Sequence, residues 1–284
     1  MVSGVRRSLD ACGMLRHLAM TLLLSLTTGS IRSLLDPKAD PPRTLHDAPS
    51  YACGEFGLRG LSVEADMLAG WSVADLELMR NRADQAGCPC LVLIDRTPLL
   101  VAEAVEDTRT DAAARLGRLA QGASRLGCNS VAVEIAVPTG DEDALERAID
   151  TMQGVMTAVE RLELNLLLAP SSGMTASAEG LSDLIKRVGG FRIGALPTYG
   201  DPVSSDDPIA QMRHLAPYAG AVHVRVEGFN KKGAHTGLDL AAGVAAAKAV
   251  GYQSNIAIDY VGASPAKDLP RAVEVLQAAV EAEG

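Results

Sequence analysis

The sequence is poor in aromatic, histidine and cysteine residues. Aromatic side chains make up 3% of the 284 residues, and there are five histidines and five cysteines, whereas 48% of the residues are hydrophobic. A core of aliphatic side chains suits layered packing better than an aromatic-rich sandwich. The cysteines are odd in number and irregularly spaced, and more ligands would be needed nearby for a zinc site. We therefore expect reduced, buried thiols in a cytoplasmic protein.

Positive charge is also scarce, because 26 Lys and Arg face 35 Asp and Glu and give a formal net charge of −9. A protein that holds nucleic acid needs a basic face for the phosphates. The balance therefore argues against this class and disfavours an anionic membrane surface, although a local basic cluster could still bind a phosphate. It suits a protein that handles a small molecule.

No hydrophobic run is long enough to span a bilayer. Residues 14–26 have a basic start and an apolar stretch, which is similar to a short signal peptide. We interpret the stretch as a buried first strand after a flexible leader of residues 1–18. A signal peptide, and a native start at Met14, remain the alternatives.

Short apolar runs alternate with longer amphipathic segments, which is typical of βα units around a parallel sheet. The predicted strands are residues 21–26, 58–64, 90–94, 130–136, 165–168, 192–196, 221–226 and 255–260. The predicted helices are residues 44–56, 72–86, 110–126, 142–162, 178–188, 207–216, 238–249 and 267–282.

Eight strands and eight helices in strict alternation predict an α/β fold, a single-domain (β/α)₈ TIM barrel over residues 19–284. An open doubly wound sheet is the competing architecture. It usually carries a glycine-rich phosphate turn after the first strand, and residues 27–30 (Thr-Thr-Gly-Ser) do not match that fingerprint. In a barrel, the loops 36–43 and 196–205 follow strands and lie at the end where active sites form.

Several runs carry a family resemblance. They are the first strand and its exit (residues 25–32), the second strand (56–64), the glycine stops at Gly87 and Gly127, and the segment 215–225 that leads into His-Val-Arg. In these runs the chain resembles the xylose isomerase-like barrels, also known as the AP endonuclease family 2 fold. The resemblance covers nearly the whole chain from about residue 19.

The resemblance implies a sugar or sugar-phosphate isomerase or epimerase with a divalent metal, Mn, Mg or Zn, held by carboxylates and histidine at the strand ends. Glu134, His223 and Asp259 are the candidate ligands. The expected ligands after the fifth and sixth strands are missing, since residues 167–170 read Leu-Leu-Ala-Pro and residues 196–200 carry no acid. Asp201 is a possible substitute. The chain either uses another metal set, works without metal, or is no catalyst.

Three polar residues interrupt apolar strands and form the candidate catalytic set. Glu134 and Asp259 are carboxylates in strands where an unpaired charge is costly, so either could be a general base. His223 could donate a proton or polarise a carbonyl. The alternative is that they form structural ion pairs, for Glu134 with a neighbour such as Arg225.

Further polar residues at strand ends are candidates for binding substrate. Arg225 shares a face with His223 and could hold a carboxylate or phosphate. The others could instead be caps or solvated surface groups. The set is Arg225, Glu227, Glu64, Asp95, Lys231 and His235.

We thus expect a sugar or keto-acid isomerase or epimerase that works by acid–base proton transfer at the barrel mouth. Its partner is a small molecule, and homo-oligomers stay possible. The alternative is a non-catalytic or metal-independent barrel that binds a small ligand or a partner protein. A DNA-repair nuclease is disfavoured, because such relatives need a histidine-rich three-metal centre.

Overall fold

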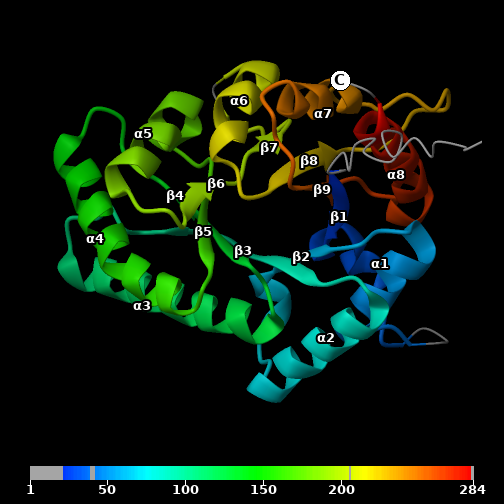
Figure 1. The fold of residues 1–284 in the computed structure, drawn as a ribbon, viewed down its shortest axis with the longest axis horizontal. Helices are drawn as coiled ribbons and strands as arrows, with labels where there is room; N and C mark the ends of the chain where they lie inside the picture. The colour runs from blue at the N-terminus through cyan, green and yellow to red at the C-terminus, as the bar shows by residue number, and fades with distance from the viewer. Residues whose placement is uncertain (1–21, 39–41, 205, 283–284) are drawn as a thin grey trace, which may run out of the picture.

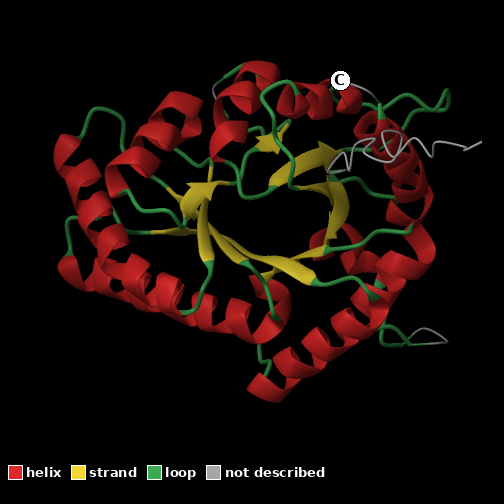
Figure 2. Cartoon of the chain, viewed as in Figure 1, coloured by secondary structure: helices red, strands yellow, loops and turns green. Residues whose placement is uncertain are grey.

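The computed structural model describes residues 22–38, 42–204 and 206–282, in which parallel strands are surrounded by helices (Figures 1 and 2). The predicted leader of residues 1–18 lies outside the described residues. The strands are β1 (Leu23–Thr27), β2 (Leu61–Glu64), β3 (Cys90–Leu99), β4 (Ser130–Ile135), β5 (Asn165–Ala169), β6 (Ile193–Ala195), β7 (Thr198–Tyr199), β8 (Val222–Val226) and β9 (Asn255–Tyr260). The main helices are α1 (Ala48–Phe56), α2 (Val73–Ala86), α3 (Glu106–Leu126), α4 (Glu142–Arg161), α5 (Ala178–Val188), α6 (Pro208–Leu215), α7 (Leu240–Lys248) and α8 (Pro265–Glu281).

The strands follow the order β6-β5-β4-β3-β2-β1-β9-β8-β7, and all pairs are parallel. The two end strands of this order, β6 and β7, are consecutive in the chain and share one position in the ring. Leu196 N donates to Leu168 O at 2.8 Å, and His223 N donates to Pro197 O at 3.0 Å. The segment between β6 and β7 thus bonds to both neighbours, and the sheet curls into the predicted single-domain TIM barrel (Figure 2).

The alternation of side chains along each strand builds two cores. Outward side chains such as Val222, Val224 and Ile258 join the large cluster between the strands and the helices. Inward side chains form a smaller apolar cluster inside the ring: Val92, Ile94, Ala132, Leu167, Leu196 and Ala221. This inner cluster is the floor beneath the polar residues at the strand ends.

Local sequence signals fix the ends of the helices. Ser72 and Asp75 form a reciprocal capping box at the start of α2. Gly87 and Gly127 end α2 and α3 in the left-handed conformation that glycine adopts without strain. These features confirm the predicted boundaries there. No helix among the described residues is long and apolar enough to cross a membrane.

Several predicted elements differ from the structure; the third strand, for example, continues to Leu99 instead of ending at residue 94, and the first α-helix begins at Ala48 instead of residue 44. The sixth strand, predicted as residues 192–196, is divided into β6 and β7, because Pro197 has no N–H to donate and the chain changes its partner there from β5 to β8. The second strand begins only at Leu61, where pairing with β1 begins. The third helix begins at Glu106 rather than residue 110, with Glu106 and Asp107 in its first turn, where carboxylates are favourable.

The cysteines that the structure describes are free thiols, as expected. Cys88, Cys90 and Cys128 are buried, and burial raises the pKa of Cys88 and of Cys90 to about 12. Such thiols stay protonated at neutral pH, so they serve as small core side chains.

Candidate active site at the mouth of the barrel

Most inward side chains near the carboxyl ends of the strands are polar, with Ala169 of β5 as an exception. Arg96 follows Val92 and Ile94 on the inner face of β3, and Glu134 follows Ala132 on β4. By the same alternation, Glu64, Arg225 and Asp259 point inward from β2, β8 and β9. Parallel strands place all these residues at one end, here called the mouth.

Arg96 is the centre of the mouth. Its Nη2 lies 3.0 Å from each carboxylate oxygen of Asp259, and its Nε donates to Glu64 Oε1 at 3.1 Å. Burial opposes the charged form, but Asp259 and Glu64 together raise the pKa of Arg96. The guanidinium therefore stays charged and joins β2, β3 and β9 across the mouth.

Asp259 is fully engaged by its neighbours. Besides Arg96, it accepts a hydrogen bond from Thr27 Oγ1 at 3.1 Å, and its side chain is only 7% exposed. Ser30 stabilises the backbone on both sides of Asp259, because its Oγ donates to Ile258 O and accepts from Tyr260 N. Asp259 is thus held in place as the counter-charge of Arg96.

Glu64 lies between two arginines. Arg32, in the 3-10 helix η2 (Thr28–Leu34) after β1, donates to Glu64 Oε2 at 2.9 Å and also binds Asp66. A Cβ at position 29 would lie 2.4 Å from Glu64 Oε1. Only glycine at position 29 therefore leaves room for the carboxylate where Arg96 and Arg32 hold it.

Glu134 is the carboxylate of the mouth without an ion pair or hydrogen bond to its side chain within the described residues. Burial raises its pKa to about 7, Arg96 opposes this shift, and the charges of Asp201 and Asp95 add to it. A carboxyl group with such a pKa exchanges protons readily near neutrality. The ion pair with Arg225, considered as an alternative from the sequence, does not form.

Asp201 and Arg225 form the side of the mouth next to β7 and β8. Burial raises the pKa of Asp201, whereas the N–H of Val203, Arg225 and Arg96 oppose the shift. Arg225 is 30% exposed, and its nearest carboxylate is that of Glu227, 3.8 Å from its Nε. Its guanidinium is consequently held only loosely.

His223 lies two residues before Arg225 on the inner face of β8, deeper in the barrel. It is completely buried, and neither ring nitrogen has a hydrogen-bond partner among the described residues. Burial lowers its pKa to about 4, although Asp259 acts in the opposite direction. The imidazole is therefore neutral at physiological pH.

The other candidates have different surroundings. Asp95 lies on the outer face of β3, where it binds Arg115 of α3 and accepts from Thr97 N. His235 lies in the loop after β8, and its ring bonds to Glu227 N and Leu238 O at 3.0 and 2.7 Å. Lys231 is exposed in the same loop. The structure therefore does not bring these three residues to Arg96.

The donor set does not fit the divalent metal that the resemblance implies. Of the candidate ligands, Asp259 is bound by Arg96 and Thr27, and His223 lies below the mouth, completely buried. Across the described ranges, no three His, Cys, Asp or Glu side chains are grouped so that they could hold a metal ion. The positive charge that both Glu64 and Asp259 contact is that of Arg96, and Arg32 adds a second one at Glu64.

The central position of Arg96 was missed from the sequence, and so was the hydrogen bond of Thr27. The signal for Arg96 was its register, because it continues the inner alternation of Val92 and Ile94, while Asp95 does not. Nothing local in the sequence indicates that Thr27 reaches Asp259, 232 positions away.

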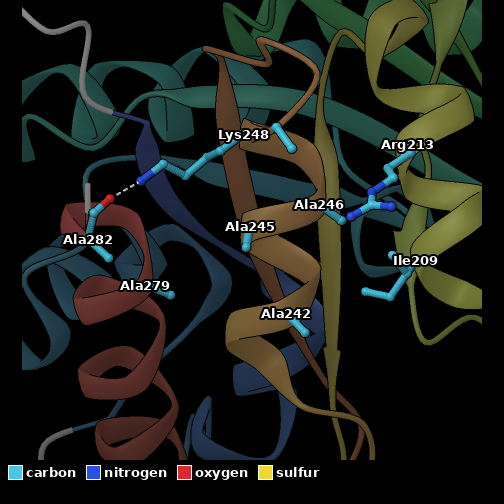
Figure 3. Close-up of a pocket in the computed structure, with 9 residues that line it drawn as sticks. Ile209, Arg213, Ala242, Ala245, Ala246, Lys248, Ala279 and Ala282 are labelled. Carbon is cyan, nitrogen blue, oxygen red and sulfur yellow. Dashed lines mark hydrogen bonds between the residues drawn. The ribbon is translucent and has the colours of Figure 1, made fainter. Parts of the chain in front are cut away.

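A cavity of about 840 Å³ lies elsewhere, outside the ring between α6, α7 and α8 (Figure 3). Alanines line most of it, with Ile209, Arg213 and Lys248 at its edges. Lys248 bonds to the carbonyl oxygens of Val280 and Ala282 at the end of α8. Because no carboxyl group or histidine lines this cavity and Lys248 is bonded to the end of α8, it does not compete with the mouth as a catalytic site.

Solved structures with the same fold are numerous, although no family model matches the chain. A D-psicose 3-epimerase crystallised with D-fructose superposes with a TM-score of 0.70 at 13% identity, over 91% of this chain and 99% of that one. A 3-keto-D-glucoside 4-epimerase from E. coli gives 0.70 at 14% identity, over 90% and 98%. A xylose isomerase domain protein from Planctomyces limnophilus gives 0.65 at 17% identity, over 91% and 96%.

No curated protein matches the chain in sequence. The structural neighbours include sugar epimerases and a xylose isomerase domain protein, and the chain has the fold of the xylose isomerase-like barrels. At such low identity the comparison shows the fold alone, and the chemistry has to be argued from the mouth.

Proposed function

We propose that the protein is an isomerase or epimerase of a sugar or a related keto acid, and that Glu134 moves the proton. The observation that carries the proposal is Glu134 itself, an inward-facing carboxyl group that is paired with none of the described residues and whose pKa is raised by burial to about 7. Sugar epimerases are among the structural neighbours, which supports a carbonyl sugar as the substrate class.

In the proposed reaction, ionised Glu134 removes a proton from the carbon next to the substrate carbonyl. The electron pair moves to the carbonyl oxygen, and the guanidinium groups of Arg96 and Arg225 stabilise the resulting oxyanion. Protonated Glu134 then returns the proton to the neighbouring carbon, whose hydroxyl proton passes to the former carbonyl oxygen, and this completes an isomerisation. For an epimerisation, the enediolate first turns its other face to Glu134, which then returns the proton to the same carbon. Near pH 7 both forms of Glu134 are populated, as the two steps require.

The other polar residues have supporting roles in this proposal. Asp259, expected as an alternative base, holds Arg96, because its carboxylate already accepts from Arg96 and Thr27. His223 remains a neutral group below the mouth, so it can donate only a neutral N–H and not an imidazolium proton. Glu64 fixes Arg96 from the other side.

The test is hydrogen exchange at substrate carbon in deuterated buffer. We would incubate the protein with a panel of ketoses, ketose phosphates and keto acids and follow loss of the α-proton by NMR. Exchange should occur with at least one compound and fall roughly 10²–10⁴-fold in Glu134→Gln. The control is Glu55→Gln, which removes an exposed carboxylate from α1 and should leave exchange unchanged.

A folded Glu134→Gln variant that exchanges the proton at the wild-type rate would remove Glu134 from the mechanism. No exchange with any compound of the panel would instead favour the alternative from the sequence, a barrel that binds a ligand without catalysis.

A further inference from the structure

We propose that Arg96 serves as the built-in cation of the mouth, in the place of a divalent metal, and that it binds the oxyanion of an anionic or enolised ligand. The inference rests on the proposed function for the nature of that ligand. Its basis is the position of one guanidinium between two inward-facing carboxylates from β2 and β9.

The two carboxylates are withdrawn from water. The side chains of Glu64 and Asp259 are 12% and 7% exposed. Charges in such places need a partner, and Arg96 supplies it to both through Nε and Nη2. A metal ion at this point would have to compete with a cation that the chain cannot release.

Arg96 has donors left for a ligand. A guanidinium carries five N–H groups in a planar fork. Nε and Nη2 serve Glu64 and Asp259, whereas Nη1 makes no hydrogen bond to any residue that the structure describes. Because the side chain is 43% exposed, these N–H groups are open to a ligand oxygen.

The other two acids of the mouth do not form a metal site in place of Glu64 and Asp259. Glu134 and Asp201 have no cationic side chain bonded to them in the described part of the chain, but two carboxylates are too few for a firm metal site. With Glu64 and Asp259 engaged, the mouth offers a guanidinium to an anion and no complete ligand shell to a metal.

The experiment uses the full-length protein after treatment with a chelator, and it probes metal and anion separately by calorimetry. With Mn²⁺ or Zn²⁺ alone, we expect no binding tighter than ~1 mM. With oxalate, whose adjacent oxygens imitate an enediolate, we expect binding that weakens at least about tenfold in Arg96→Gln and is partly restored in Arg96→Lys.

The matched control is Arg125→Gln. Arg125 is an exposed arginine of α3 that pairs with Glu77 and bonds to no residue of the mouth, so oxalate binding should stay within about twofold of wild type. Circular dichroism checks that each variant is folded, and the wild-type titrations need no variant.

Stoichiometric micromolar binding of Mn²⁺ or Zn²⁺ to the wild type, lost in Asp259→Asn, would overturn the inference. Failure of the wild type to bind oxalate would overturn it as well, as would equal affinity in Arg96→Gln. These outcomes are independent of the proton exchange that tests the proposed function.

Discussion

At the scale of single residues, the role of a carboxyl group in the mouth depends on whether a hydrogen-bond donor or a cation lies next to it. Asp259 and Glu134 are both inward-facing carboxyl groups, yet only Asp259 receives bonds from Arg96 and Thr27. Asp259 is therefore fixed as a counter-charge, while Glu134 has a pKa near 7 because burial disfavours its ionised form. Two similar residues thus take different roles.

The raised pKa of Glu134 predicts how stability depends on pH. Unfolding lowers the pKa from about 7 to its ordinary 4.5, so the folded state binds more protons between these values. The contribution of Glu134 to stability therefore falls as pH rises from about 4.5 to 7 and stays low above that. Glu134→Gln should be more stable than wild type by about 1–3 kcal/mol at pH 8, with the advantage disappearing near pH 4.

Urea denaturation at several pH values measures this difference. The Glu55→Gln variant, which changes an exposed carboxylate, should follow the wild-type profile. A Glu134→Gln variant that is less stable than wild type at pH 8 would show that the ionised carboxylate is stabilised in the fold, contrary to the inferred pKa.

At the scale of elements, the sequence determined most helices and strands through hydrophobic period, capping residues and glycines. α5 and β9 have the predicted bounds, and the glycine ends of α2 and α3 are as expected. The division into β6 and β7 was not predicted, because it depends on which neighbour the chain can reach on either side of Pro197. Which strands pair depends on the closed ring, so a short stretch of sequence gives little indication of it.

Gly173 offers a test of contact between elements. It lies in the loop after β5 with φ at +75°, and a Cβ there would be 1.9 Å from Val137 O. Gly140 has nearly the same φ, +77°, but a Cβ there would meet no atom within 4 Å. Gly173→Ala should therefore destabilise the protein by roughly 1–3 kcal/mol more than Gly140→Ala.

Thermal or urea denaturation of the two variants gives this comparison directly. Both substitutions share an unfavourable positive φ, so the difference reports what is particular to Gly173, namely its ψ of −139° and its bridge to Val137. Equal losses of stability would mean that the loop moves apart at little cost.

At the scale of the whole molecule, the ring has one thin sector. β6 and β7 comprise three and two residues, whereas β9 has six and pairs with β1 and β8 along most of its length. We expect amide hydrogens of residues 193–199 to exchange faster than those of residues 255–260, because fewer ladder bonds must open. Hydrogen exchange followed by mass spectrometry measures both peptides in one sample, and equal protection would contradict this expectation.

The fold and the set of polar residues at the strand ends could be predicted from the sequence, but their connections could not. Glu134, Arg225 and Asp259 were recognised because a charge stands out in an apolar strand. The roles of Arg96 and Thr27 depend on strands that meet only after the ring closes, with Asp259 163 and 232 positions away. The alternation along one strand predicts whether a side chain points inward, but it does not predict which residues that side chain contacts.

The positive charge between Glu64 and Asp259 is part of the polypeptide itself. Because Arg96 is encoded in the sequence, every folded molecule carries this cation. Unlike a bound metal ion, this guanidinium can neither dissociate from the protein nor be exchanged for another ion. Glu64 and Asp259 are therefore paired with a cation without any bound ion.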